Sequence, residues 1–289
     1  MKRKFIKRWL LPPGILDLFI RGKIAVTKGI KKSSIEKLLN SSEILENSNL
    51  GERCFIFGAG SSINRQDLRR LVGESVISVS NTFVHPDYAN IKPKYHVLPP
   101  LQQGHGQMHS ESNFVSWLAE MEKKVTDAAI FLHIGDYNLV HQNHLFKNHQ
   151  IYWVDYCSWS GDLNFPIDLS RIPYIWSVSE LAITVALYQG FSKIYLIGID
   201  HDWFNGPLIY FFDHEKDHSL KPNQDKLVNK FGVDAEFQMR RHADIFKKYK
   251  YLYSKNKNIF NANADPDHYL DVFPKVDFAS LFNDKRKDK

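Results

Sequence analysis

The residues best suited to bind a ligand form a glycine-rich stretch, Gly58-Ala59-Gly60-Ser61-Ser62, which directly follows an apolar segment. Glycines let a backbone approach a phosphate or a ribose closely, and a helix after such a loop offers N–H groups. Ile63 stands where a dinucleotide fingerprint has its third glycine, and the next apolar segment ends in Ser80-Asn81, not in an acidic residue. No Gly-Lys-Ser/Thr follows, which excludes a P-loop. We predict a nucleotide-contacting loop of another kind, with a structural tight turn as the alternative.

A second set of candidate residues is Gly198-Ile199-Asp200-His201-Asp202-Trp203, which also follows an apolar segment. Two carboxylates at this spacing could hold Mg²⁺ or Mn²⁺, since such hard ions prefer oxygen ligands. Two ligands are a minimal set, however, and Asp200 could instead hydrogen-bond the glycine loop without a metal. We therefore assign no metal and no other cofactor, and keep Mg²⁺ for an alternative function.

Residues 201–231 are polar and show neither a helical nor a strand period. A segment of about 30 such residues in a compact domain is usually functional, so we predict an active-site lid. Histidine titrates near neutral pH and suits the role of general base, although a solvated lid histidine is the alternative. We favour His214 over His218 as the catalytic base, because the adjacent Asp213 could orient its ring.

The elements that position these loops alternate between short apolar strands and helices. We expect strands over residues 53–57, 75–80, 94–98, 128–133, 150–154, 193–198 and 257–261. We expect helices within 33–52, from the glycine loop to about Leu71, and over 112–124, 177–189 and 235–252. Ser177 and Glu180 can form a capping box, and Gly190 suits the end of that helix. The pattern predicts an α/β fold with a Rossmann-like, mostly parallel sheet, helices on both faces, and ligands at the carboxyl ends of the strands.

The length and composition favour one large domain over residues 34–289. The chain has 289 residues, of which 43% are hydrophobic, enough to bury a substantial core. Its two cysteines, Cys54 and Cys157, can form neither a disulfide framework nor a four-thiolate zinc site. The sequence contains no run of 18 or more apolar residues, so it predicts no membrane-spanning helix.

The basic charge is concentrated in residues 1–33, which hold ten basic side chains and one acidic one, whereas residues 34–289 hold 28 basic and 31 acidic ones. Bulky apolar residues such as Trp9 and Phe19 alternate with these charges. This amphipathic pattern favours an arm on an anionic membrane surface, hence a cytoplasmic protein on the inner membrane face. Packing of the arm on its own domain is the alternative, and Pro12-Pro13-Gly14 argues against a signal peptide. We expect no nucleic-acid partner, and a homo-oligomer stays open.

The stretches FIFGAGSSI, WSVSELAITVALYQG and FSKIYLIGIDHDWFNG, with the strand ending in Asn81, resemble bacterial sialyltransferases of the kind first met in Campylobacter surface glycans. They are equally similar to the group that contains the motility accessory factors and the methanogen hydroxymethylpterin diphosphokinase. The resemblance covers residues 53–215, and YLDVFPKVDF resembles the ending of other members of that group. It implies a modified GT-A-like fold and an inverting, metal-independent transfer of an acidic sugar. The implied donor is a CMP-linked sugar, and the implied acceptor is a bacterial surface glycan such as capsule or lipopolysaccharide.

The resemblance also implies roles for individual residues. The nucleotide and donor sugar would meet Gly58, Ala59, Gly60, Ser61, Ser62, Asn81, Ser177, Ser179, Gly198, Asp200, His201 and Trp203. Tyr210 matches a tyrosine that steadies the leaving phosphate. Trp203 stands at the other such tyrosine, and its indole N–H cannot replace a hydroxyl. His214 and His218 compete for the lid histidine, and with Asp200 they are the candidate catalytic residues.

Two other functions stay open. In a diphosphokinase-type phosphotransferase, Asp200 and Asp202 would carry Mg²⁺. In a glycan-assembly scaffold, the chain would have no catalytic role.

Overall fold

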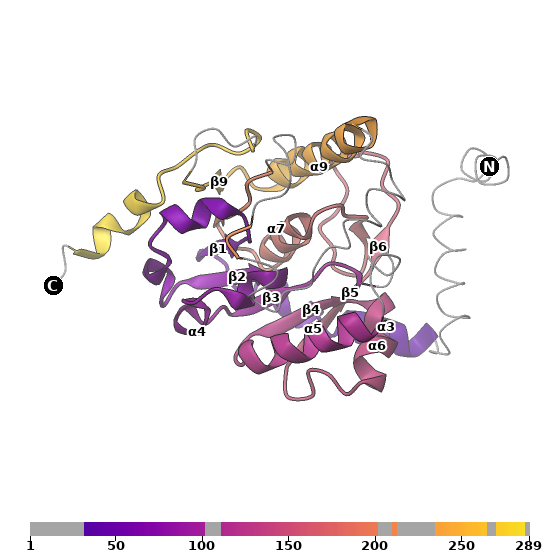
Figure 1. The fold of residues 1–289 in the computed structure, drawn as a ribbon. Coiled ribbons are helices and arrows are strands. Elements are labelled where there is room, and N and C mark those ends of the chain that lie inside the picture. The colour runs from indigo at the N-terminus through magenta and orange to yellow at the C-terminus, as the bar shows by residue number, and fades with distance from the viewer. Residues whose placement is uncertain (1–31, 102–110, 202–209, 213–234, 265–269, 287–289) are drawn as a thin grey trace.

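The computed structural model describes residues 32–101, 111–201, 210–212, 235–264 and 270–286. Their centre is a seven-stranded sheet with only parallel pairings and the order β5-β4-β3-β2-β1-β8-β9 (Figure 1). Its strands are β1 (Arg53–Phe57), β2 (Ser75–Val79), β3 (Tyr95–Val97), β4 (Ala129–His133), β5 (Ile151–Val154), β8 (Lys193–Ile197) and β9 (Ile259–Asn261). The predicted α/β fold with a parallel, Rossmann-like sheet is confirmed.

Helices cover both faces of the sheet, as the alternation of elements predicted. They are α3 (Lys32–Asn40), α4 (Tyr88–Ile91), α5 (Glu111–Lys124), α6 (Tyr137–Gln142), α7 (Val178–Tyr188) and α9 (Ala235–Lys255). Successive residues of a strand point to opposite faces. Phe55 and Phe57 of β1 accordingly belong to the core cluster that includes α5, whereas Cys54 and Ile56 belong to the cluster that includes α7 and α9. Figure 1 shows α5 and the α7–α9 pair on opposite sides of the sheet.

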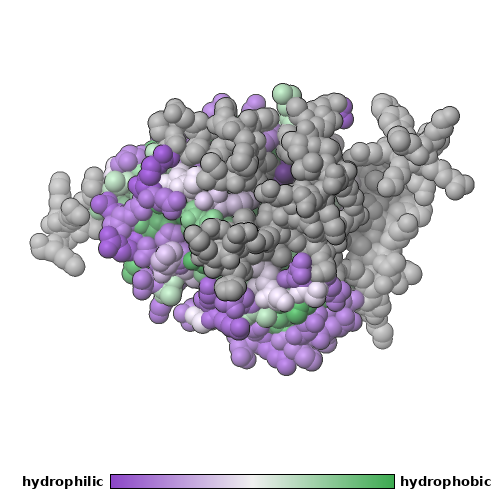
Figure 2. All heavy atoms as spheres, in the orientation of Figure 1, coloured by the Kyte–Doolittle hydropathy of each residue, from purple (hydrophilic) through white to green (hydrophobic). Residues whose placement is uncertain are grey.

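The described surface seen in Figure 2 is mainly hydrophilic, with smaller apolar areas between the polar side chains. The apolar side chains gather instead on the two faces of the sheet, beneath the helices. Within the described ranges, no helix combines the length and the apolar character needed to cross a membrane.

The predicted helix from the glycine loop to Leu71 is wrong. Two 3-10 helices, Ser61–Arg65 and Leu68–Leu71, occupy this stretch, and the extended backbone of Gln66 separates them. The Gln66 side chain donates to Ala262 O at 2.6 Å and fixes the break. A 3-10 helix of five residues is too short to build up the dipole of an α-helix. The glycine loop therefore lacks the anion-binding helix N-terminus that the sequence suggested.

A second, two-stranded sheet was not predicted. It pairs β6 (Tyr156–Cys157) with β7 (Ile172–Pro173) in parallel. Strands of two residues are too short to show a period, so nothing in the sequence pattern distinguishes them from a loop.

The strand order reverses at β1, which lies between β2 and β8. From β1 to β5 each new strand adds on one side, and the chain then crosses back to place β8 on the other side of β1. The loops after β1 and β8 thus leave the same carboxyl edge in opposite directions. In open α/β sheets this arrangement forms the crevice that binds ligands. Both candidate loops, at residues 58–62 and 198–201, lie at this switch point.

Two glycines allow these loops to touch. The N–H of Gly58 donates to Ile197 O, and the N–H of Gly60 donates to Gly198 O, both at 2.8 Å. A Cβ on Gly58 would lie 2.3 Å from Gly198 O, and a Cβ on Gly198 would lie 2.5 Å from Gly58 O. Gly198 also has a φ of +63°. Both glycines are therefore required by the backbone contact itself, whatever ligand the loops bind.

Gly198→Ala should lower the free energy of unfolding by roughly 2–5 kcal/mol, because it adds a clash to the cost of a left-handed backbone. Gly73→Ala is the matched control, since Gly73 has a φ of +80° but nothing lies within 4 Å of an added Cβ. We expect this control to lose only about 1–2 kcal/mol. Urea denaturation of the three proteins measures both losses, and equal losses would contradict the contact as the cause.

Candidate functional site

The glycine loop is closed by the carboxylate of Asp200. Its Oδ2 accepts a hydrogen bond from the Ser62 N–H at 3.0 Å, and its Oδ1 accepts one from the Ser62 hydroxyl at 2.6 Å. Both residues are buried. Gly60 makes room for the carboxylate, because a Cβ there would lie 2.4 Å from Asp200 Oδ2. Asp200 thus hydrogen-bonds the glycine loop, as the sequence analysis considered.

The turn after β8 is held from the β9 side by Asn263. The Ile199 N–H donates to Asn263 Oδ1 at 3.2 Å, and Asn263 Nδ2 donates to Ile199 O at 2.8 Å. Asn261 supports this residue in turn, since its Oδ1 accepts from the Asn263 N–H at 3.0 Å. These asparagines were not singled out from the sequence. Their position at and just beyond the carboxyl end of the last predicted strand is the signal that could have pointed to them.

Residues 210–212 cross the glycine loop. Tyr210 pairs with Gly60 in an isolated antiparallel bridge, and the Phe211 N–H donates to Ala59 O at 3.2 Å. Tyr210 also stacks on Phe212 with 5.1 Å between ring centroids. Tyr210, which the resemblance links to the leaving phosphate, therefore lies beside the loop linked to the nucleotide.

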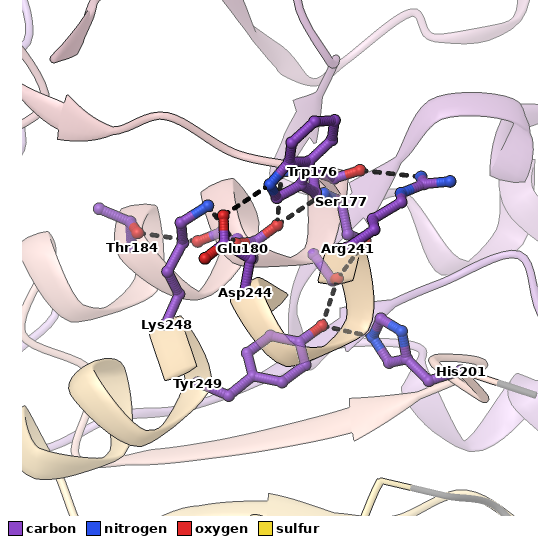
Figure 3. A network of polar contacts seen from close by, with 10 residues as sticks. Trp176, Ser177, Glu180, Thr184, His201, Arg241, Asp244, Lys248 and Tyr249 are labelled. Atoms are coloured by element: carbon purple, nitrogen blue, oxygen red, sulfur yellow. Dashed lines mark hydrogen bonds and ion pairs between the residues drawn. The ribbon is translucent and has the colours of Figure 1, made fainter. Parts of the chain in front are cut away.

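A buried chain of hydrogen bonds runs behind the turn after β8 (Figure 3). The His201 Nε2 lies 2.5 Å from the Tyr249 hydroxyl, which lies 2.6 Å from the Ser179 hydroxyl. The Ser179 hydroxyl lies 2.6 Å from that of Ser177. This relay joins the switch point to α9 and to the start of α7. Ser177 and Ser179, both predicted site residues, thus connect to His201 through Tyr249, which the sequence did not indicate.

The start of α7 is a capping box, as predicted from Ser177 and Glu180. The N–H groups of Ser177 and Trp176 donate to Glu180 Oε2 at 2.6 and 2.8 Å. Glu180 is buried, and its Oε1 lies 3.4 Å from Lys248 Nζ of α9. Burial raises the pKa of Glu180, while Lys248 and the two N–H groups oppose the rise. These N–H groups are already satisfied by the chain's own carboxylate, so they are not where an outside anion would bind.

Arg241 of α9 brings a buried guanidinium to the same region (Figure 3). Its Nη2 donates to Trp176 O at 3.1 Å, and the hydroxyl groups of Tyr210 and Tyr174 lie within electrostatic reach. Burial lowers the pKa of Arg241 to about 10, so the side chain is charged at neutral pH. A largely buried guanidinium is a strong partner for phosphate or carboxylate groups. In the sequence this arginine looks like an ordinary residue of a charged helix.

His201 is a neutral group at this site. Its burial, together with the nearby His242 and Arg241, lowers its pKa to about 3. Its backbone has a φ of +52°, a left-handed conformation that costs energy for a residue with a side chain. His201 therefore contributes a fixed ring and a hydrogen bond to Tyr249, but no positive charge near neutral pH.

His242 of α9 is a buried histidine that the sequence analysis did not consider. Its ring centroid lies 6.5 Å from that of His201, with the two rings nearly perpendicular. Its side chain also lines an open cavity along α9. A histidine thus sits between the turn after β8 and that cavity.

The other predicted residues divide into two groups. Asn81 follows β2, and its Oδ1 accepts a hydrogen bond from Trp117 Nε1 of α5 at 2.7 Å. Asp202, Trp203, His214 and His218 lie outside the described residues, as does most of the basic arm. Among the residues that the structure describes, no three His, Cys, Asp or Glu side chains are placed to hold a metal ion.

No protein-family model matches the chain, and no curated protein matches it either. Among solved structures, the chain is similar to the sialyltransferase CstII from Campylobacter jejuni, determined in complex with a substrate analogue, cytidine-5'-monophosphate. The two share 16% sequence identity, the match covers 78% of this chain and 85% of that chain, and the TM-score is 0.45.

His201 should make the fold sensitive to acid. Its pKa is about 3 in the folded protein and about 6.5 in an unfolded chain. Between these values the unfolded state binds a proton that the folded state does not, so stability falls as the pH drops below about 6.5. The loss from this residue should be about 2 kcal/mol at pH 5. His201→Asn should remove that part of the pH dependence, since asparagine does not titrate and tolerates a left-handed backbone.

Urea denaturation at pH 7.5 and pH 5 of the natural and His201→Asn chains measures this difference. His96→Asn is a control, because burial lowers the pKa of His96 to about 3 as well, while its ring lies against Ser78 and Tyr88, away from the switch point. It should flatten the pH dependence similarly. An NMR titration that gives His201 a pKa above 5 in the folded protein would contradict the expectation.

Proposed function

We propose that this chain is a glycosyltransferase that moves a sugar from a nucleotide-activated donor to a glycan acceptor. The observation that carries the proposal is the convergence of three separate segments at the β1–β8 switch point. They are the glycine loop, the turn with Asp200 and His201, and the segment that begins with Tyr210. A nucleotide bound at the carboxyl edge of a parallel sheet would contact all three.

The charged part of the donor would lie between Arg241 and Tyr210. The guanidinium would attract the phosphate, and a phosphate there would offset the cost of burying the cation. The Tyr210 hydroxyl would donate to an oxygen of the leaving phosphate as the bond to the sugar breaks. These two groups supply the charge stabilisation that a metal supplies in other transferases, which supports a metal-independent reaction. An acidic sugar and a CMP-linked donor are the finer proposal, and they rest on the sequence resemblance.

A direct, inverting transfer needs a base that takes the proton of the acceptor hydroxyl as the new bond forms on the side opposite the leaving phosphate. We propose His214 or His218 for this role, on the resemblance and on their place in the polar segment 201–231. His242 is a third candidate, because it lies beside His201 and lines the neighbouring cavity.

The alternative phosphotransferase is less favoured by the surroundings of Asp200. Both of its carboxylate oxygens accept hydrogen bonds from Ser62, so a metal would have to compete with these donors. A scaffold without catalysis is less favoured too, because buried Arg241 and Glu180 are costly to fold and such perturbed groups gather at functional sites.

We keep the proposal that residues 1–33 attach the protein to the anionic inner face of the membrane, where surface glycans are assembled. It rests on the concentration of basic and bulky apolar side chains in this arm.

The nucleotide is tested by thermal shift with CMP, CDP, UDP, GDP and ATP, each with and without Mg²⁺. A ligand at 100 times its dissociation constant should stabilise the protein by about 2.7 kcal/mol. We expect CMP to raise the melting temperature without Mg²⁺. Ser61→Glu should lower the affinity for the best-binding nucleotide at least tenfold, because it adds a negative charge on the partly exposed part of the glycine loop.

Ser34→Glu carries the same charge change at an exposed position of α3 and should leave the affinity unchanged. A response to ATP only with Mg²⁺ would favour the phosphotransferase, and no response to any nucleotide would refute the transferase.

The base is tested by replacing His214, His218 and His242 singly with Gln and measuring turnover of the donor with a soluble acceptor. We expect His214→Gln to lower kcat by roughly 10²-fold or more, since general bases contribute 10²- to 10⁴-fold. Nucleotide affinity should stay nearly constant in that variant. A loss confined to His218→Gln or His242→Gln would move the role to that residue, and full activity in all three variants would refute a histidine base.

A further inference from the structure

An open groove runs along one side of α9. Its lining residues on α9 lie at intervals of three or four, with one adjacent pair, and so form one stripe. Lys257, just beyond the end of α9, and the segment after β9 complete the lining. The lining residues are Met239, His242, Ala243, Phe246, Lys250, Tyr253, Lys257, Asp271 and Val272. They surround an open cavity of about 780 Å³. We call this cavity the α9 groove.

The α9 groove extends away from the switch point. The chain leaves the carboxyl end of β8 before α9 and enters β9, parallel to β8, after it, so α9 runs back from the carboxyl edge towards the amino edge. From Met239 to Tyr253 the helix rises by about 21 Å. A ligand of several linked units could therefore lie along the groove with one end at the carboxyl edge.

The lining combines aromatic rings with positive charge. Phe246 and Tyr253 are partly buried against the core and present rings to the groove. Lys250 and Lys257 are exposed, and Lys257 Nζ lies 4.4 Å from the centroid of the Tyr253 ring. Asp271 is the one acidic side chain of the lining. Aromatic rings offer flat apolar surfaces to the C–H faces of sugar rings, and ammonium groups bind carboxylates and phosphates.

One end of the α9 groove reaches the proposed donor site. His242 lines the groove and also contacts the ring of His201, whose neighbour Asp200 holds the glycine loop. The groove is thus the surface along which an acceptor could approach the donor from the side of α9.

We propose that the α9 groove binds the acceptor, and that the acceptor is an oligosaccharide bearing carboxylate or phosphate groups. That the bound glycan is an acceptor rests on the proposed function, but the binding of an acidic glycan does not depend on catalysis. Acidic residues outnumber basic ones in residues 34–289, 31 to 28, so this domain as a whole has no excess of positive charge to attract a polyanion. Two lysines against one aspartate make the groove a locally attractive place for it.

A glycan array that carries acidic, neutral and basic oligosaccharides tests the ligand class with the full chain. We expect binding to acidic oligosaccharides only, and weaker binding as the salt concentration rises, because exposed charges are screened. Binding of none, or equal binding of neutral oligosaccharides, would overturn the proposal.

The site is tested by titration calorimetry with the best acidic oligosaccharide of that array. The double variant Lys250→Glu/Lys257→Glu should bind it at least tenfold more weakly. The matched control is Lys247→Glu/Lys255→Glu, on the same helix but outside the groove, where these lysines lie over Trp159 and Tyr251. The control should stay within threefold of the natural chain, and an equal loss in both double variants would overturn the site.

Thermal shift with nucleotides on the same variants separates the two proposals. The groove variants should keep the natural nucleotide response. Acidic-glycan binding without any nucleotide response would refute the transferase and leave the groove as a glycan site. A nucleotide response without acidic-glycan binding would refute the groove alone.

Discussion

The hydrogen bonds between Ser62 and Asp200 are the constraint on which the candidate site depends. They join residues 138 positions apart in the chain, across the boundary between β1 and β8. A buried carboxylate is costly without donors, and here a backbone N–H and a hydroxyl satisfy it. Gly60 must lack a side chain to let the carboxylate approach, and Asn263 must hold the turn from behind. The glycine loop is therefore shaped first by this contact, and any nucleotide must fit the backbone that the contact leaves exposed.

The inner side of α9 positions the part of the candidate site that contains His201 and Arg241. Ile245 and Leu252 pack into the core there, but Lys248 and Tyr249 place polar groups between them. A buried ion pair such as Lys248–Glu180 adds little net stability compared with apolar residues of similar size. What it provides is register, because Lys248 and Tyr249 each have a partner at the start of α7. This register fixes the position of His201 and of the guanidinium beside it.

The elements that follow a local sequence pattern were predictable from the sequence. The features that depend on a single contact between distant residues were not. Most strands of the main sheet are short, mainly apolar runs, and the capping box of α7 is a local pattern of four residues, so both were found. The helix expected after the glycine loop failed because Gln66 bonds to Ala262, a contact between distant residues that no local propensity reports. Arg241, His242 and Tyr249 escaped notice for the same reason. Polar residues of an amphipathic helix are expected to face the solvent. Only the packing of α9 against the rest of the fold shows that these three side chains are buried or largely buried.

The two faces of α9 have complementary roles under the proposals made here. The inner face fixes the donor side of the site through Tyr249 and Arg241, and the outer face lines the α9 groove through Phe246 and Lys250. His242 lies where these faces meet, in contact with His201. A single helix that forms the wall of both subsites fixes the distance between donor and acceptor by its own rigid geometry. This rigidity matters because transfer requires the acceptor hydroxyl to lie within about 3–3.5 Å of the reacting carbon. The buried polar pairs of α9 with α7 add little net stability, but they fix the position of α9 where that position most affects the proposed transfer.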